Sequence, residues 1–303
     1  MELLYFFEKI RLPGLNELML AVTTLGEETA FLVIALVLFW CVNKYQGYYI
    51  LSVGFVGTIA NQFMKLWFRI PRPWVLDENF TILEQARDAA TGYSFPSGHT
   101  QSAVGTFGGV ALSTKNKAVR IAAVILAVLV PVSRMYIGVH TPLDVGVSVV
   151  LALALVFLIR PIVLRHTHTK MALLFAAMIC LGIAYLVFVE VYSFPADIDP
   201  RNYESGLESA YTLLGALLGI AVVYIADEMW LHFSTNAIWW AQILKVFCGL
   251  ALVLVVKTGT KEILNGIFGD LAGRAVRYFL VVVVAGVVWP LTFQWFSKLG
   301  CKE

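Results

Sequence analysis

Three basic side chains stand in or beside long apolar runs, where a charge is costly. Lys65 lies in the run NQFMKLWF, Arg72 follows it by seven residues, and Arg134 ends an uninterrupted apolar run. Seven residues are about two turns of a helix, so Lys65 and Arg72 would share one face. Both heads could simply reach for the membrane interface. Three such cations together favour an anionic ligand, and a phosphate group fits because arginine grips it with two hydrogen bonds while lysine acts as a point charge.

The stretch YSFPSGHT, Tyr93–Thr100, stands directly before another apolar run. Ser97 has the position of a helix N-cap, and Gly98 then belongs to the loop. Free backbone donors at a helix start attract anions, and a glycine lets a phosphate oxygen come close to the backbone. The cap does not explain His99. Beside three cations and a second histidine, His99 is a candidate general acid.

The stretch SRMYIGVHTPLD, Ser133–Asp144, carries that second histidine. Thr141, Pro142 and Asp144 have the pattern of a helix start with a capping box, in which Asp144 needs no catalytic role. Asp144 could also accept a hydrogen bond from one ring nitrogen of His140 and leave the other nitrogen as a lone pair. Both interpretations can hold together. His140 is therefore a candidate nucleophile.

These residues describe phosphoryl transfer without a metal. His140 would attack phosphorus, cationic and backbone groups would hold the oxygens, and His99 would protonate the leaving alkoxide before water hydrolyses the phosphohistidine. The expected phosphate ligands are Lys65, Arg72, Ser97, Gly98 and Arg134. No carboxylate cluster suited to Mg²⁺ accompanies them, and the four cysteines show no metal-binding spacing. We expect no metal and no other cofactor.

The elements that must position these groups are membrane helices. Of the 303 residues, 59 % are hydrophobic and only 14 % are charged, against roughly a quarter in soluble proteins. The mean hydropathy is +0.80. A net charge of +2 does not indicate a nucleic-acid partner. The expected fold is therefore an all-α, polytopic membrane helix bundle, with the lipid bilayer as its partner.

Nine spanning helices are expected, since a span needs about 20 mostly apolar residues. They are Thr29–Asn43, Tyr48–Phe68, His99–Ser113, Ala118–Ile137, Leu143–Val163, Lys170–Glu190, Ser209–Ala226, Ala237–Val256 and Ala275–Phe296. Before them, Leu15–Leu25 is amphipathic and is expected on the membrane surface. No cleavable signal peptide is expected at the amino terminus.

Basic residues in short loops indicate the cytoplasmic side of a membrane protein. They are Lys44, Lys115, Lys117, Arg120, Arg160, Arg165, Lys170, Lys298 and Lys302. Acidic residues gather in the loops of the other side, at Asp77, Glu78, Glu84, Asp88, Asp197, Asp199, Glu204 and Glu208. The amino terminus is then outside and the carboxyl terminus inside. All the candidate site residues fall at helix ends on the non-cytoplasmic side, so we expect a multi-pass membrane protein with an outward-facing site. The general character of the chain suggests that the membrane is a bacterial cell membrane.

The three stretches together resemble the type 2 phosphatidic acid phosphatase superfamily, which also includes vanadium haloperoxidases. Its motifs K-x6-R-P, P-S-G-H and S-R-x5-H-x3-D are filled in order, from Lys65 to Asp144. The resemblance implies His140 as nucleophile, Asp144 as its partner and His99 as general acid, with the phosphate ligands given above. It also includes Ser133, with a less defined role.

The resemblance implies a catalytic core of about six helices, which would correspond to residues 1–190. The last three helices, in residues 191–303, depart from the family pattern and are expected to form a membrane extension. Nine helices with an outside amino terminus look similar to the glucose-6-phosphatase and sphingosine-phosphate phosphatase branches, on topology alone. The expected substrate is an amphiphilic phosphate or diphosphate that reaches the site from the bilayer. The lipid itself and the oligomeric state stay open.

Four alternatives remain beside a lipid phosphatase. The same phosphohistidine could be handed to a lipid or sugar hydroxyl by a phosphotransferase, or the substrate could be a soluble sugar phosphate. A haloperoxidase would hold vanadate in the same pocket, but nine spans argue against a type known from soluble proteins. A lipid transporter that kept the fold would be expected to lack a catalytic residue, and none is missing.

Overall fold

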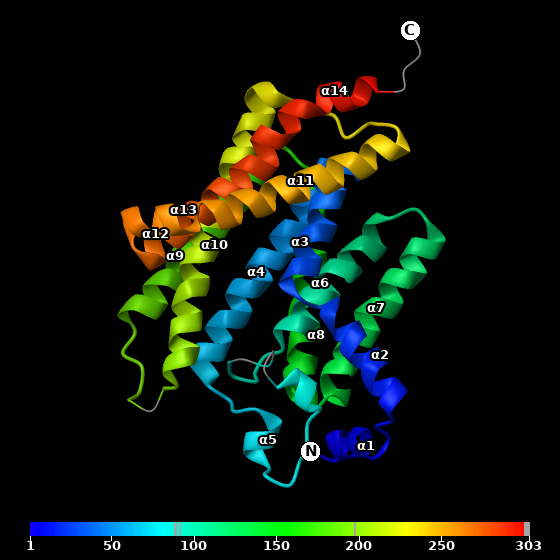
Figure 1. Ribbon diagram of the computed structural model, residues 1–303, viewed down its shortest axis with the longest axis vertical. Coiled ribbons are helices and arrows are strands. Elements are labelled where there is room, and N and C mark those ends of the chain that lie inside the picture. Colours follow the sequence, from blue (N-terminus) through cyan, green and yellow to red (C-terminus); the bar gives the residue numbers. More distant parts are fainter. Residues whose placement is uncertain (88–89, 91, 197, 300–303) are drawn as a thin grey trace. The chain divides into compact units, whose positions relative to one another are not determined.

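The protein is described from a computed structural model, which covers residues 1–87, 90, 92–196 and 198–299 (Figure 1). Within these ranges the chain forms helices and loops, with no β-strand. The expected fold class, an all-α membrane bundle, is confirmed. Three residues used in the loop-charge argument, Asp88, Asp197 and Lys302, lie outside the described ranges.

The helices in chain order begin with α1 (Glu2–Lys9), α2 (Pro13–Thr24), α3 (Glu28–Val37), α4 (Lys44–Phe68), α5 (Pro73–Leu76), α6 (Gly98–Ser113) and α7 (Lys117–Tyr136). They continue with α8 (Pro142–Leu164), α9 (His168–Val191), α10 (Pro200–Ala226), α11 (Trp239–Gly259), α12 (Lys261–Phe268), α13 (Asp270–Val283) and α14 (Phe293–Lys298). Short 3₁₀ or π turns extend α3, α10 and α13.

Within the described residues, six helical stretches are long and apolar enough to cross a membrane, and one bent helix pair raises the number to seven. The six are Lys117–Tyr136, Pro142–Leu164, His168–Val191, Pro200–Leu231, Trp239–Phe268 and Asp270–Lys298. The expected count of nine is not confirmed. The helix α6 has only 16 residues, and α4 carries Lys44, Asn61 and Lys65 among its apolar residues. Polar groups that serve a site thus weaken the hydropathy of the helices that carry them.

The segment expected as a surface helix, Leu15–Leu25, belongs to that bent pair. The helix α2 and the stretch Glu28–Val42 meet at 55°. Gly26 lies at the bend, where an added Cβ would be 2.8 Å from Cγ1 of Val130 and 2.9 Å from the carbonyl oxygen of His99. Only a residue without a side chain allows this close approach, so the bend is held against the start of α6.

The chain forms two compact units that alternate along the sequence. The first comprises Met1–Ile34, Tyr49–Pro161 and Pro195–Ser205, and the second Ala35–Tyr48, Ile162–Phe194 and Gly206–Glu303. The expected division at residue 190 was based on the number of helices in the family core, whereas these units are based on contacts within the chain. The division at residue 190 therefore stays a prediction.

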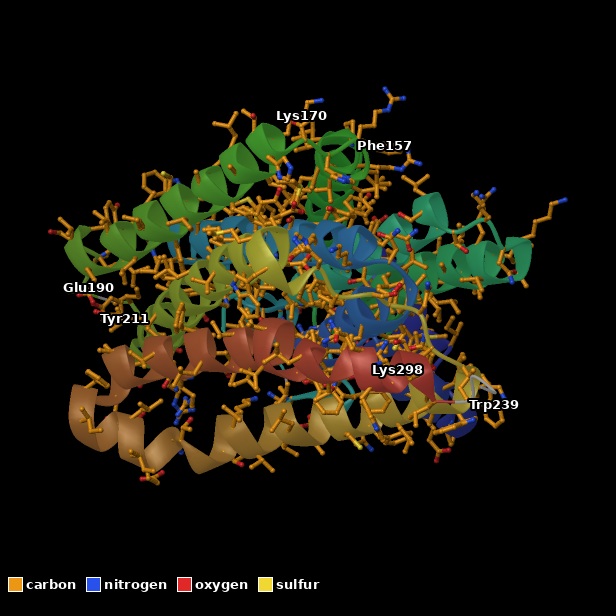
Figure 2. The ribbon with its side chains drawn as sticks, turned by 90° about the horizontal axis from the view of Figure 1, so that it is seen from above. Phe157, Lys170, Glu190, Tyr211, Trp239 and Lys298 are labelled. Atoms are coloured by element: carbon orange, nitrogen blue, oxygen red, sulfur yellow. The ribbon has the colours of Figure 1, made fainter. Side chains whose placement is uncertain are left out.

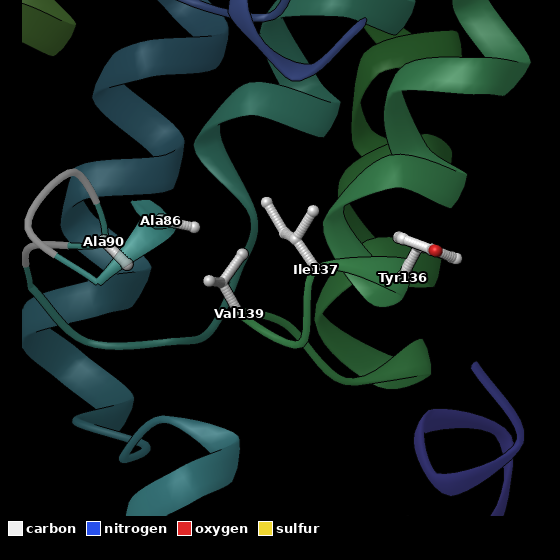
Figure 3. Packing of buried hydrophobic residues seen from close by; sticks show 5 residues of the cluster. All are labelled: Ala86, Ala90, Tyr136, Ile137 and Val139. Atoms are coloured by element: carbon white, nitrogen blue, oxygen red, sulfur yellow. The ribbon is translucent and has the colours of Figure 1, made fainter. Parts of the chain in front are cut away.

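In the first unit, α6 and α7 lie side by side and α2 packs against α7 (Figure 1). A small apolar cluster of Ala86, Ala90, Tyr136, Ile137 and Val139 joins the loop before α6 to the end of α7. Figure 3 shows Ile137 and Val139 on the side that faces the two alanines. Arg11 adds polar links, donating to the carbonyl oxygens of Tyr136 and Thr81. The segment just before His140 is thus anchored on both sides.

In the second unit, α11 runs beside α13 and α14. Figure 2 shows that Trp239, the first residue of α11, lies near Lys298, the last residue of α14, so α11 begins close to where α14 ends. Lys44 forms an ion pair of 2.6 Å with Asp227, whose side chain is only 1 % exposed. This pair gives a basic partner to Asp227, the first residue of the short π-helical turn Asp227–Leu231 that follows α10.

Candidate active site

The candidate residues meet at a cavity of about 240 Å³ within the first unit. Six of the eight residues expected from the sequence line it: Lys65, Arg72, Gly98, His99, Arg134 and His140. They come from the end of α4, the loop after it, the start of α6, the end of α7 and the loop before α8. Ser97 and Asp144 lie behind this wall.

The three cations enter the cavity from different elements. Nζ of Lys65 donates to the carbonyl oxygen of Tyr93 at 2.5 Å, and Arg72 donates to the carbonyl oxygens of Gly92 and Val139. Arg134 is 3 % exposed and donates to Oγ1 of Thr23 at 2.7 Å, while its Nε has no partner among the described residues. Three positive charges around one cavity make a strong site for an anion.

The start of α6 is capped as the sequence predicts. Oγ of Ser97 accepts a hydrogen bond from the amide of Thr100 at 3.4 Å, and the amide of Ser97 donates to the carbonyl oxygen of Asp144 at 3.2 Å. The hydroxyl and the amide of Ser97 therefore both form hydrogen bonds that stabilise the start of α6. The amides of Gly98 and His99 lie in the first turn, which has no intrahelical acceptors for them, and both residues line the cavity.

His140 and Asp144 form the second polar group of the site. Oδ2 of Asp144 accepts hydrogen bonds from the amide of Thr141 at 2.7 Å and from Oγ of Ser94 at 2.6 Å. The amide of Asp144 donates to Oγ1 of Thr141 at 3.3 Å, which completes the capping box. Nδ1 of His140 lies 3.6 Å from Oδ2 of Asp144 and 3.5 Å from Oγ of Ser94. The capping role of Asp144 and its position beside His140 therefore occur together.

The contacts of His140 indicate which ring nitrogen carries the lone pair. Nε2 lies 3.1 Å from Nη1 of Arg72, and a guanidinium can only donate. Nε2 must then accept, which leaves the proton on Nδ1, the nitrogen that faces Ser94 and Asp144. Burial lowers the pKa of His140 below its ordinary value, and the nearby charges of Arg72 and Arg134 lower it further. His140 is thus a neutral base whose lone pair faces the cations.

Several residues that the sequence analysis did not select take part in this arrangement. Ser94 bridges His140 and Asp144, and Thr23 holds Arg134 across 111 residues of sequence. The hydroxyl of the motif residue Ser133 donates to the carbonyl oxygen of Val130, and Ser133 does not line the cavity. Ser94 stands two residues before the P-S-G-H motif, but nothing in the sequence marks the distant Thr23.

The cavity continues beyond the phosphate ligands expected from the sequence. Its remaining lining residues are Gly26, Glu27, Glu28, Thr58, Asn61, Gln62, Gln101 and Ser102. On α4, Thr58, Asn61 and Lys65 are three to four residues apart, so they form a polar stripe on one face of an otherwise apolar helix. That stripe was a signal available in the sequence.

No group of three or more His, Cys, Asp or Glu side chains with the arrangement of a metal site exists in the described part of the chain. The carboxylates at the cavity, Glu27 and Glu28, stand next to each other at its rim, and Asp144 is committed to Ser94 and Thr141.

An all-α membrane protein with this combination of cations and histidines is of the class of membrane phosphatases, and comparison with known proteins gives the family. The profile of the PAP2 superfamily matches residues 45–168. The profile described as PAP2 superfamily phosphatase, transmembrane extension, matches residues 211–302. The chain belongs to the PAP2 superfamily, is a phosphohydrolase of that family and is a multi-pass membrane protein.

Three relatives show how the chain compares with known proteins. Phosphatidylglycerophosphatase B of Bacillus subtilis is 32 % identical over 164 residues, which are 50 % of this chain and 76 % of the relative. Undecaprenyl-diphosphatase BcrC of Bacillus subtilis is 34 % identical over 105 residues, 35 % of this chain and 51 % of the relative. An undecaprenyl-diphosphatase of Sulfolobus acidocaldarius is 32 % identical over 136 residues, 45 % and 64 % respectively. No solved structure was found to match the chain.

Proposed function

We propose that this protein hydrolyses a lipid phosphate or diphosphate at the non-cytoplasmic face of the membrane, through a phosphohistidine and without a metal. The observation that carries the proposal is the placement of His140. Its Nε2 lies 3.1 Å from Arg72 in a cavity that is also lined by Lys65 and Arg134, while its Nδ1 faces Ser94 and Asp144. A base with its lone pair among phosphate-binding cations suits attack on phosphorus.

In the first step, Nε2 of His140 forms a bond to phosphorus as the bond from phosphorus to the leaving oxygen breaks. The cations and the first amides of α6 stabilise the charge on the non-bridging oxygens. His99 protonates the leaving oxygen, and the phosphate dianion favours the protonated form of His99 that this needs. The imidazolium proton on Nδ1 stays directed toward Ser94 and Asp144.

In the second step, water attacks the phosphohistidine. His99 has lost its proton and takes one from the water, while the bond from phosphorus to Nε2 breaks. The products are the free alcohol, or the lipid monophosphate when the substrate is a diphosphate, and inorganic phosphate. Each group of the protein returns to its starting protonation state.

Two further observations support a lipid substrate. The relatives are named for phosphatidylglycerophosphate and undecaprenyl diphosphate, which are both lipids. The cavity residues lie at the ends of helices rather than in a separate soluble domain. A lipid could then reach the site directly from the bilayer.

The test combines hydrolysis with trapping of the intermediate. Purified protein in detergent with excess EDTA is mixed with phosphatidate, phosphatidylglycerophosphate or undecaprenyl diphosphate that carries ³²P in the terminal phosphate. Phosphate release is measured, and rapid quenching at alkaline pH preserves a phosphohistidine, which is acid-labile. We expect release and protein-bound label, both absent in His140→Ala. Release that needs a divalent metal, or release that persists in His140→Ala, would contradict the mechanism.

A further inference from the structure

The run Gly92–Ser94, just before the P-S-G-H motif, anchors two of the cations that the proposed function needs. The carbonyl oxygen of Gly92 accepts a 2.9 Å hydrogen bond from Nε of Arg72, and the carbonyl oxygen of Tyr93 accepts one from Nζ of Lys65. A lysine or arginine carries several N–H donors, so a cation held in this way can still donate to a phosphate. The position of the run therefore determines where both cations point.

The two ends of this run are held differently. At the end next to the motif, Ser94 is fully buried, and its amide donates to the carbonyl oxygen of Ile70 at 2.8 Å. Oγ of Ser94 also donates to Asp144. At the other end, Gly92 has φ of +76°, in the left-handed region that favours glycine. The direction of the carbonyl group that holds Arg72 thus depends on a backbone conformation that glycine adopts easily.

A segment distant in sequence, Pro195–Ser205, contacts the first two residues of the run and belongs to the same compact unit. The amide of Asp199 donates a long hydrogen bond, 3.4 Å, to the phenol oxygen of Tyr93. Oδ1 of Asn202 would lie 3.5 Å from a Cβ built at Gly92, which is ordinary van der Waals contact. The two residues whose carbonyl groups hold the cations are therefore both supported by this segment.

A small pocket of about 80 Å³ adjoins this contact. Residues of the segment, Asn202 and Ser205, line it together with Tyr93 and Lys65. Lys65 also lines the larger cavity that holds the candidate catalytic residues. The side chain of Lys65 therefore lies between that cavity and the segment.

Local bonds order the part of the segment that makes these contacts. Oδ1 of Asp199 accepts from the amide of Arg201 at 2.9 Å, and its carbonyl oxygen accepts from the amide of Asn202 at 3.0 Å. An aspartate followed by Pro200 is the pattern of an N-cap with proline at the first helical position. The cap of α10 thus fixes the amide that meets Tyr93 and the side chain that lies beside Gly92.

We propose that Tyr93, Asp199 and Asn202 are positioning residues, through which the segment Pro195–Ser205 holds Lys65 and Arg72 ready to bind phosphate. A long cationic side chain that is fixed before its ligand arrives loses less freedom on binding. The proposal rests on the proposed function, in which these cations bind the phosphate group. The segment lies between the matches of the two family profiles, residues 45–168 and 211–302, so neither profile assigns it this role.

The first test removes the hydroxyl of Tyr93. In full-length protein in detergent, Tyr93→Phe should raise KM for phosphatidate about threefold, within the range that one hydrogen bond contributes. The dissociation constant of ³²P-labelled inorganic phosphate, measured by equilibrium dialysis, should rise by a similar factor. We expect kcat to stay nearly unchanged, because Ser94 keeps its own bonds. Tyr211→Phe is the control, since that hydroxyl bonds to Glu190 within the second unit, and it should change none of the three constants.

The second test changes the cap of α10. Asp199→Ala should raise KM and the phosphate dissociation constant at least about threefold, because the start of the helix loses its cap. Asp199→Asn should restore the wild-type values, since asparagine caps a helix as well as aspartate does. A merely electrostatic effect of Asp199 would be lost in both variants, and that pattern would contradict the positioning role. These variants also keep the proposal testable if Tyr93→Phe does not fold.

A third test asks whether Tyr93 acts through Lys65. Residues that act through one another have non-additive effects, which a double-mutant cycle measures. Tyr93→Phe should therefore weaken phosphate binding less in a Lys65→Ala background than in the wild type. An equal factor in both backgrounds would show that Tyr93 does not act through this lysine and would overturn the proposal.

The outcomes separate the failure of this proposal from the failure of the proposed function. A wild-type protein that binds and releases phosphate, together with a Tyr93→Phe variant that has the same constants or a change in kcat alone, would overturn the positioning role. A folded wild-type protein that neither binds inorganic phosphate nor releases it from any lipid would instead contradict the proposed function.

Discussion

Oγ of Ser94 donates a 2.6 Å hydrogen bond to Oδ2 of Asp144 and lies 3.5 Å from Nδ1 of His140. The direct distance from Nδ1 to Oδ2 is 3.6 Å, which is too long for a good hydrogen bond. The hydroxyl can accept from Nδ1 and donate to the carboxylate at the same time. In the proposed mechanism, Asp144 would then act on His140 in part through Ser94, and Ser94 would be a positioning residue.

Ser94→Ala should lower kcat about tenfold, roughly 1.4 kcal/mol of transition-state stabilisation, with little change in KM. The reason is that the imidazolium formed on attack loses its bridge to Asp144, whereas the phosphate ligands are untouched. Steady-state phosphate release measures both constants. Ser113→Ala is the matched control, because that hydroxyl bonds only to the carbonyl oxygen of Gly109 in its own helix. A rise in KM at constant kcat would contradict the positioning role.

Thr23→Val should raise KM about tenfold while the protein stays folded, since a hydrogen bond to a charged group contributes roughly 1.5–3 kcal/mol. The substitution keeps the shape of the side chain and removes the acceptor that orients Arg134. The adjacent Thr24→Val is the control, because the hydroxyl of Thr24 bonds to the carbonyl oxygen of Ala21 in its own helix. Equal effects of the two variants would mean that Thr23 does not act through Arg134.

The pH dependence of kcat/KM should show its acid limb below pH 6.5. A neutral His140 can attack and a protonated one cannot, so activity falls as the pH drops through the pKa. Burial, followed by the charge of Arg72, holds that pKa below the ordinary value of 6.5. The pH profile is measured with two substrates whose phosphate groups have different pKa values. An acid limb at the same pH for both substrates comes from the enzyme, whereas a limb that shifts between them comes from the substrate. A shared limb above pH 6.5 would be inconsistent with a neutral His140 in the free protein.

The outward orientation can be tested by thiol labelling. After replacement of the native cysteines, a cysteine at the exposed position Asn79 should react with an impermeant thiol reagent in intact cells. A cysteine at Lys115, expected on the cytoplasmic side, should react only after the cells are opened. The opposite pattern would reverse the proposed topology and place the site inside. Both positions are exposed in the structure, so burial would not hide either one.

The sequence was most informative where chemistry depends on residues close together in the chain. The capping box at Thr141–Asp144 and the N-cap at Ser97 follow from local patterns, and the structure has both. The expected helix count depended on hydropathy alone. It is not confirmed, because α6 is short and α4 carries polar residues that line the cavity.

Other parts of the site depend on contacts that a single sequence cannot express. Thr23 meets Arg134 because α2 packs against α7 and the bend at Gly26 lies against α6. The α2 sequence, which ends in Thr23 and Thr24, has no feature that indicates such a contact. Asn61 stands in the run NQFMKLWF. The sequence does not show that Asn61 of α4 and Gln101 of α6 line the same cavity.

The cavity wall at Gly26–Glu28 lies before residue 45, where the match to the family profile begins. The residues proposed to break the phosphate bond lie within that profile, whereas this part of the cavity wall lies outside it. Exchange of the amino-terminal segment during evolution could therefore change this part of the cavity wall and leave the catalytic motifs as they are. An engineer could do the same by grafting the first 34 residues of one relative onto the motifs of another.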